Sequence, residues 1–313
     1  MFLDTFMDDA SEGIMENPVP ELEDLQLECA VSLEAAYNDV MLEMCQLKYQ
    51  SLVEGVSVIN EGVIEIIKNF FKKLFNSNEK FFDRISGDTS SKDLDNLKKQ
   101  SNDYHIAAGI RYMLKHPEIS KKYKLIGYDT VFLNEIDFDS GRCTAADRAI
   151  DRIEGDSKPN GDEIALDVLH TFIKSAFGNT NKINADQINS LADFKKALYN
   201  HVQYVTMNEL FKNDYNKSDR DIQMCIDKMK SRIPNAIEYR KAFEKNTRIY
   251  AGQVIAIIAK KYPNRVNIAC KATKVIHQAC MIAISYGQWL NVEIAHGFSQ
   301  VFNAAAKMNI KED

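Results

Sequence analysis

The chain has 313 residues, of which 45% are hydrophobic and 27% are charged, and its formal net charge is −6. This composition is typical of a globular protein that is long enough to bury a sizeable core. With only 13 glycines and six prolines, the chain lacks the turn residues that a β-barrel or β-sandwich needs, so long helices are expected.

Charge is distributed unevenly along the chain. Residues 1–47 contain twelve acidic residues and no lysine or arginine, and Lys48 is the first base. The other 266 residues hold 33 acids and 39 bases, so this body carries a charge of +6. An acidic arm on a mildly basic body predicts electrostatic contact, either with the chain's own body or with a neighbour. Spread over so many residues, +6 is a weak indication of nucleic-acid binding.

The first 86 residues are predicted to form two units. Residues 1–20 combine acids with the sequence NPVP at 17–20, which predicts an acidic arm that is either flexible or clasped by another surface. Residues 21–86 are predicted to be a long amphipathic helical segment. Apolar residues recur there at helical spacing, first over 21–49 and then over 52–85.

The stretch NFFKKLFNSNEKFF at 69–82 holds five of the sixteen phenylalanines. On a helical wheel its apolar side chains share one face, and its lysines lie on the other. This face predicts contact with a partner or a membrane through Phe70, Phe71, Leu74, Phe75, Phe81 and Phe82.

Three interpretations of this aromatic face remain open. It packs within the protein or against another subunit, it lies in a membrane surface, or it stacks on nucleic acid. Packing is favoured because the same apolar stripe continues back to Leu52, where the polar face carries Glu54, Glu61 and Glu65. A membrane-surface helix would need basic residues on that face.

Residues 87–155 are predicted to be a mixed connector of helices and loops. A helix is expected from Ser90 or Ser91 to about Lys115, because serine is a favoured N-cap. The one stretch with strand-like composition predicts at most a small β-hairpin near 123–137.

Residues 156–313 are predicted to form an α-helical bundle, and the polar loop at 155–162 is the best candidate for an internal boundary. The expected fold class is therefore mainly α, with long N-terminal amphipathic helices followed by a C-terminal multi-helix bundle. Glycine, proline and polar breaks delimit six bundle helices, at 162–178, 184–205, 217–233, 235–262, 265–288 and 290–308.

Cysteine usage and hydropathy bear on the compartment. The six cysteines are scattered without CxxC spacing, which predicts reduced thiols in a reducing compartment. The sequence shows no basic signal-peptide start and no run of eighteen apolar residues. Neither a secretory leader nor a membrane-spanning helix is therefore expected.

Several common catalytic patterns do not occur in the sequence: GxxxxGK[ST], GxGxxG, HExxH and GxSxG. His277 and Cys280 lie one helical turn apart, which suits a thiol–imidazole contact or half of a metal site. His277 lies among apolar helix residues, however, and a histidine in that setting is more commonly buried and hydrogen-bonded.

A second candidate for chemistry is the acidic group Asp129, Glu135, Asp137 and Asp139, which resembles a cation-binding loop. It fails the EF-hand pattern, because glycine falls at loop position 5 and Arg148 at position 12. A solvated loop is the favoured interpretation. No catalytic residue, metal or cofactor is predicted, and no small-molecule substrate is expected.

An acidic arm, a helix ending in FFKKLFNSNEKFF and a long helical body together resemble the virion-associated proteins of large tailed bacteriophages that infect low-GC Gram-positive hosts. The Lys-, Asn- and Ile-rich composition is similar to that of proteins from AT-rich genomes. The resemblance covers about the first hundred residues and transfers no functional residue. It implies a component of the virion, assembled in the host cytoplasm: a capsid or neck protein, or an internal protein packaged with DNA.

The sequence thus favours a non-enzymatic structural or assembly protein that binds other virion proteins or itself. The contacts are predicted to come from residues 1–85, which comprise the N-terminal arm and the amphipathic helices. Two alternatives stay open. One is an internal virion protein that is ejected with DNA and contacts a membrane through 69–82. The other is a metal-dependent enzyme with a site at 129–139 or at His277 and Cys280.

Overall fold

The computed structural model describes residues 69–70, 72, 90–100, 103–178, 180, 182–211, 219–232 and 236–308. The predicted arm at 1–20 and most of the segment at 21–86 lie outside these ranges. The described part is mostly helical with one small sheet, which confirms the predicted fold class. Its elements are α3 (Ser90–Gln100), α4 (Tyr104–Lys115), α5 (Pro117–Ser120), β1 (Lys124–Ile126), η2 (Leu133–Glu135), α6 (Phe138–Gly155), α7 (Gly161–Phe177), η3 (Ala185–Gln187), α8 (Leu191–Asn200), β2 (Tyr204–Thr206), α9 (Met207–Leu210), α10 (Asp219–Lys230), α11 (Ala236–Lys261), η4 (Pro263–Arg265) and α12 (Val266–Ala306).

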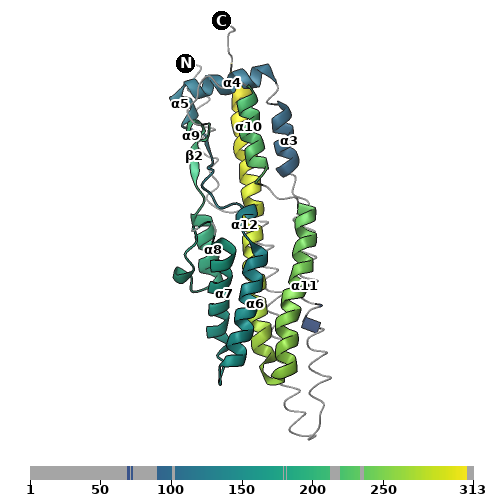
Figure 1. Cartoon of the computed structure of the whole chain (residues 1–313). Coiled ribbons are helices and arrows are strands. Elements are labelled where there is room, and N and C mark those ends of the chain that lie inside the picture. The colour runs from purple at the N-terminus through teal and green to yellow at the C-terminus, as the bar shows by residue number, and fades with distance from the viewer. Residues whose placement is uncertain are drawn as a thin grey trace.

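Helix α12 is the axis of the molecule (Figure 1). It has 41 residues, which gives a length of about 60 Å at 1.5 Å per residue. The sequence predicted two helices here, with a break after 288, and that prediction is wrong. A Cβ atom on Gly287 would lie 2.8 Å from the Leu133 side chain. The glycine therefore admits a close neighbour and leaves the helix intact.

Four helices pack together at one end of this axis. Helices α6 and α7 form a hairpin, and α11 and α12 pack on it (Figure 1). The loop predicted as an internal boundary is the turn of this hairpin, where the Asn160 side chain accepts a hydrogen bond from Asp162 N at 3.0 Å and caps α7. Arg148 and Arg152 of α6 both reach the Asp167 carboxylate of α7, at 2.7 and 3.1 Å.

At the other end, α4 lies across the end of α12 (Figure 1). A Cβ atom on Gly109 would collide with the carbonyl oxygen of Ala305, so the two backbones approach as closely as glycine allows. The helix expected from about 90 to 115 is two helices, because a new helix begins after Asp103, whose carboxylate accepts from His105 N at 2.9 Å. Two ion pairs join α3 to α10: Lys98 with Asp227, and Lys230 with Asp95.

The sheet joins two segments that are far apart in the chain. Strand β1 pairs antiparallel with β2, with Lys124 opposite Thr206. The sequence predicted at most a small β-hairpin near 123–137, and the partner strand of β1 lies far later in the chain. The prediction that placed 204–205 in a helix is wrong. Gln203 N donates to the Thr130 hydroxyl at 2.9 Å just before β2. The main-chain hydrogen bonds between β1 and β2 therefore take the place of hydrogen bonds within a helix.

The buried apolar residues form one connected cluster that runs along α12 and includes Phe70. Its largest fully buried side chains are Tyr286, Phe70, Phe132, Phe172, Phe177, Phe194, Phe211, Phe243, Phe298 and Phe302.

Candidate functional site

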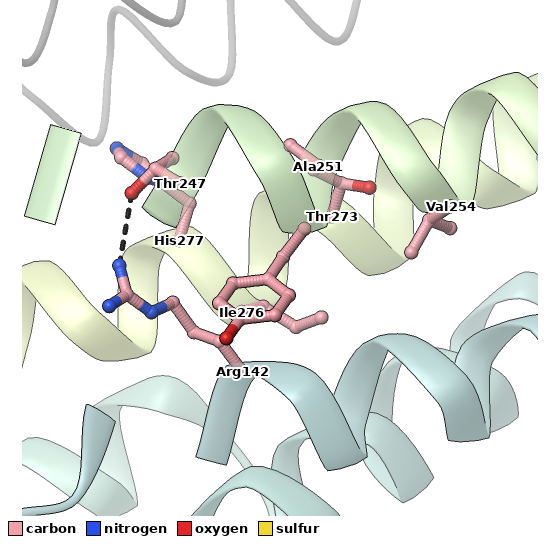
Figure 2. A pocket seen from close by; sticks show the side chains of 8 residues that line it. Arg142, Thr247, Ala251, Val254, Thr273, Ile276 and His277 are labelled. Carbon is pink, nitrogen blue, oxygen red and sulfur yellow. Dashed lines mark hydrogen bonds between the residues drawn. The ribbon is translucent and has the colours of Figure 1, made fainter. Parts of the chain in front are cut away.

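The most unusual feature of the core is a buried arginine. Arg142 lies on the inner face of α6 and is 4% exposed. A buried guanidinium is costly unless every donor finds an acceptor. The Arg142 guanidinium donates hydrogen bonds to acceptors on α6 and α11, and it lies beside His277 of α12 (Figure 2).

The hydrogen bonds of Arg142 tie two helices together. Its Nε donates to the Phe138 carbonyl at 3.1 Å, and its Nη2 donates to the Asp139 carboxylate at 2.5 Å. Its Nη1 reaches α11, donating to the Phe243 carbonyl at 3.3 Å and to the Thr247 hydroxyl at 3.2 Å. The guanidinium also lies over the Phe243 ring, 4.7 Å from its centroid, an arrangement in which cation and ring attract each other.

His277 completes the polar group from α12. It is 3% exposed, and neither ring nitrogen has a hydrogen-bond partner among the described residues. Burial and, to a smaller extent, the nearby Arg142 guanidinium together lower the pKa of His277 to about 3. The imidazole is therefore neutral at neutral pH.

Arg142 lines both a small cavity and a more open cleft. A cavity of about 20 Å³ runs between α6, α11 and α12, large enough for one water-sized molecule. In Figure 2, Arg142, Thr247 and His277 lie at one end of it, and Thr273 and Val254 toward the other. A more open cleft of about 200 Å³ is lined by Ile136, Asp137, Phe138, Asp139, Arg142, Phe243 and Asn246.

The arrangement suits structural work better than acid–base chemistry. A base with a pKa of about 3 takes up little of a substrate's proton at neutral pH. Burial raises the pKa of Cys280 to about 12, so its thiol stays protonated and is a poor nucleophile. Both carboxylates at the cleft are engaged: Asp137 caps α6, and Asp139 holds Arg142 and Asn246. The group is a polar junction between helices.

The acidic residues singled out in the sequence are not brought to one point. Asp137 accepts from Ser140 N at 2.9 Å, and Glu135 accepts from Phe132 N at 3.2 Å. Asp139 pairs with Arg142, while Asp129 is exposed. No group of three or more His, Cys, Asp or Glu side chains suited to a metal ion occurs in the described ranges.

The pair His277 and Cys280 also stays without further ligands. Both side chains are buried on α12, one turn apart. The half-buried His170 of α7 has a hydrogen-bond partner, because its Nε2 lies 2.6 Å from the Ile188 carbonyl oxygen. His277 is the exception, since its nitrogens lack such a partner.

Of the six residues predicted to contact a partner or membrane, the structure places one. Phe70 is 1% exposed and lies in the core cluster. Phe71, Leu74, Phe75, Phe81 and Phe82 lie outside the described residues. Contact of this set with a partner or a membrane stays a prediction.

Sequence reasoning missed Arg142, although a signal was present. The buried positions of α6 include Phe138, Arg142, Ala145, Ala149 and Ile153, which follow helical spacing. Arg142 is the one charged residue in that stripe, and a wheel drawn over 138–155 places it inside. Within the connector predicted at 87–155, a short helix was expected only over 144–155, so Arg142 fell outside it.

The chain matches no protein-family model, no curated protein and no solved structure. Among the helices in the described ranges, none is long and apolar enough to cross a membrane.

Proposed function

We propose that this protein is a non-enzymatic structural or assembly component of a bacteriophage particle, and that it binds other protein subunits through its N-terminal residues. One observation carries the proposal. Residues 1–47 hold twelve acids and no lysine or arginine, while the remaining 266 residues carry +6. A chain divided in this way offers two complementary surfaces for association.

The described body supports a structural role. One 41-residue helix runs through the core and carries packed elements at both ends. The side chains best suited to chemistry, Arg142, His277 and Cys280, are buried within the helical bundle. A long scaffold that encloses these three side chains fits an assembly component better than an enzyme.

The alternative of an ejected, membrane-contacting protein has a specific cost in this structure. Phe70 would have to leave the core, where it is 1% exposed. Exposing a buried phenylalanine costs about 2–3 kcal/mol, which membrane contact would have to offset. Contact of Phe70 with another subunit would have the same cost, whereas subunit binding through the acidic residues 1–47 does not require that step.

Quantitative mass spectrometry of purified particles tests the proposal. We expect the protein at a fixed copy number per particle, and we expect cross-links from residues 1–47 to another subunit or to a second copy. Absence from purified particles, combined with no stable association between the full chain and particle proteins, would overturn it. Binding to anionic liposomes that is lost in Phe71→Ser/Phe75→Ser would favour the membrane alternative.

A further inference from the structure

A basic surface lies at the end of the molecule where α4 crosses α12. Between residues 111 and 124 the chain has five cations and one acid, Glu118. This segment runs from the end of α4 through α5, which packs on α4, into β1, so its cations are close in sequence. We call it the α4–β1 basic surface, and its cations are Arg111, Lys115, Lys121, Lys122 and Lys124.

Three of these cations are available for a partner. Lys115, Lys121 and Lys124 are exposed, and none forms an ion pair with another described residue. Lys124 faces one acid of a neighbouring element, Glu209 of α9, whose pKa is lowered first by hydrogen bonds from Thr206 and then by this lysine. Other lysines of the body are paired, in Lys98–Asp227, Lys174–Asp186, Lys230–Asp95, Lys261–Glu154 and Lys271–Asp162.

The surface also presents an aromatic side chain. Tyr112 on α4 is 39% exposed, and its ring stacks on His116 with centroids 3.9 Å apart. An acidic segment with apolar side chains would find both charge and contact area here. Residues 21–47 have that character, since apolar residues at helical spacing alternate with acids.

We infer that the α4–β1 basic surface binds the acidic residues 1–47 of a second copy of this chain. The inference rests on the proposed function, and it names the partner and the receiving surface. Because the acidic segment and the basic surface are different parts of one chain, each copy can bind one neighbour and be bound by another. Such a head-to-tail contact closes into a ring or extends into a filament.

Sedimentation velocity of the full-length chain tests the contact. We expect concentration-dependent association at low ionic strength, weakened by 0.5 M NaCl because salt screens exposed charges. The variant Lys115→Glu/Lys121→Glu/Lys124→Glu should raise the dissociation constant by about tenfold or more. The control Lys158→Glu/Lys196→Glu/Lys260→Glu makes the same charge change at three exposed lysines elsewhere and should have little effect.

A charge swap separates a direct contact from a change in net charge. The variant Glu21→Lys/Glu23→Lys/Asp24→Lys should also associate weakly by itself. Mixed with the α4–β1 triple variant, it should restore a pairwise association, because its unchanged basic surface meets the unchanged acidic segment of the other variant. Circular dichroism and melting temperature, matched to those of the parent protein, exclude misfolding of each variant.

Several results would overturn the inference. One is association that the α4–β1 triple variant leaves unchanged, which would leave the proposed function standing. Another is a monomer in which residues 1–47 cross-link only to their own body. A third is binding of duplex DNA, measured by fluorescence anisotropy, that the triple variant abolishes while self-association persists. Failure of the proposed function is distinct from all three, since it requires that the protein be absent from particles.

Discussion

His277 makes the fold sensitive to acid. Its pKa falls from an ordinary value of 6.5 to about 3 in the folded protein. Between these two values the imidazole is protonated in the unfolded chain and neutral in the folded chain. The stability that depends on the neutral ring is fully present above pH 6.5 and is lost as the pH falls toward 3. Below pH 6.5 the free energy of unfolding decreases by about 1.4 kcal/mol per pH unit, which gives a decrease of about 2 kcal/mol at pH 5.

We therefore expect His277→Phe to make the pH dependence of unfolding shallower by about one proton between pH 6 and pH 4. The apolar ring removes two nitrogens that lack partners, and the adjacent cavity of about 20 Å³ gives it room. Urea unfolding at several pH values measures the slope. A uniform shift in stability with an unchanged slope would show that His277 is not the group responsible.

Arg142 is expected to contribute far more to the free energy of unfolding than an ordinary surface ion pair does. Arg142→Met keeps the aliphatic stem but removes the guanidinium donors to the Phe138 carbonyl, the Thr247 hydroxyl and the Asp139 carboxylate. The Phe243 carbonyl keeps the Thr247 hydroxyl as a donor, at 2.8 Å. We expect a loss of about 2–4 kcal/mol in the free energy of unfolding. Arg142→Lys should recover only a minor part of it, because an ammonium cannot reproduce the planar fork. Urea denaturation measures both variants.

Arg148 provides the matched control on the same helix. Its side chain is 44% exposed and pairs with Asp167 at 2.7 Å. Arg148→Met should cost less than about 1 kcal/mol, because exposed ion pairs contribute little. Equal losses for the two methionine variants would contradict a special role for the buried arginine.

At the scale of elements, two helical glycines should respond oppositely to alanine. Gly109→Ala puts a methyl group against the backbone of Ala305, so α4 must move away from α12, and we expect a loss of about 1–3 kcal/mol. Gly252→Ala on α11 meets nothing within 4 Å, so the better helix propensity should add about 0.5–1 kcal/mol. Thermal unfolding of both variants measures the difference. Similar effects in both would refute the close contact of α4 with α12.

The helices could be predicted where local signals decide the structure. The span predicted for α11 differs from the observed Ala236–Lys261 by one residue at each end, because proline and apolar spacing act within the helix itself. The missed features depend on residues far away in the sequence. Gly287 looked like a stop, but its neighbour Leu133 lies more than 150 positions earlier. Strand β2 exists because β1 pairs with it.

The candidate site was harder to predict for a similar reason. Asp139 lies three residues before Arg142 on the same helix, but nothing local indicates that His277 of α12 lies beside the same guanidinium. Two of its acceptors, the Phe243 carbonyl and the Thr247 hydroxyl, come from α11, about a hundred residues later. Spacing along a helix can place a charge on an inner face, but it cannot supply the partner that makes burial tolerable.

At the scale of the whole molecule, α12 should make the two ends unfold together. The helix is continuous over 41 residues, and it contacts α6, α7 and α11 at one end and α3 and α4 at the other. The buried apolar residues also form one cluster. Because no boundary interrupts this packing, damage at one end should lower the global stability of both.

Native-state hydrogen exchange on Arg142→Met tests this coupling, because the substitution lies in the four-helix end. The slowest amides of α7 and of α4, such as those of Phe172 and Ile110, both of which are fully buried, should lose the same free energy of protection. The Gly109→Ala variant, placed at the opposite end, should give the converse result. If Arg142→Met lowers protection in α7 and leaves α4 unchanged, the two ends unfold independently, and α12 joins two separate cooperative units.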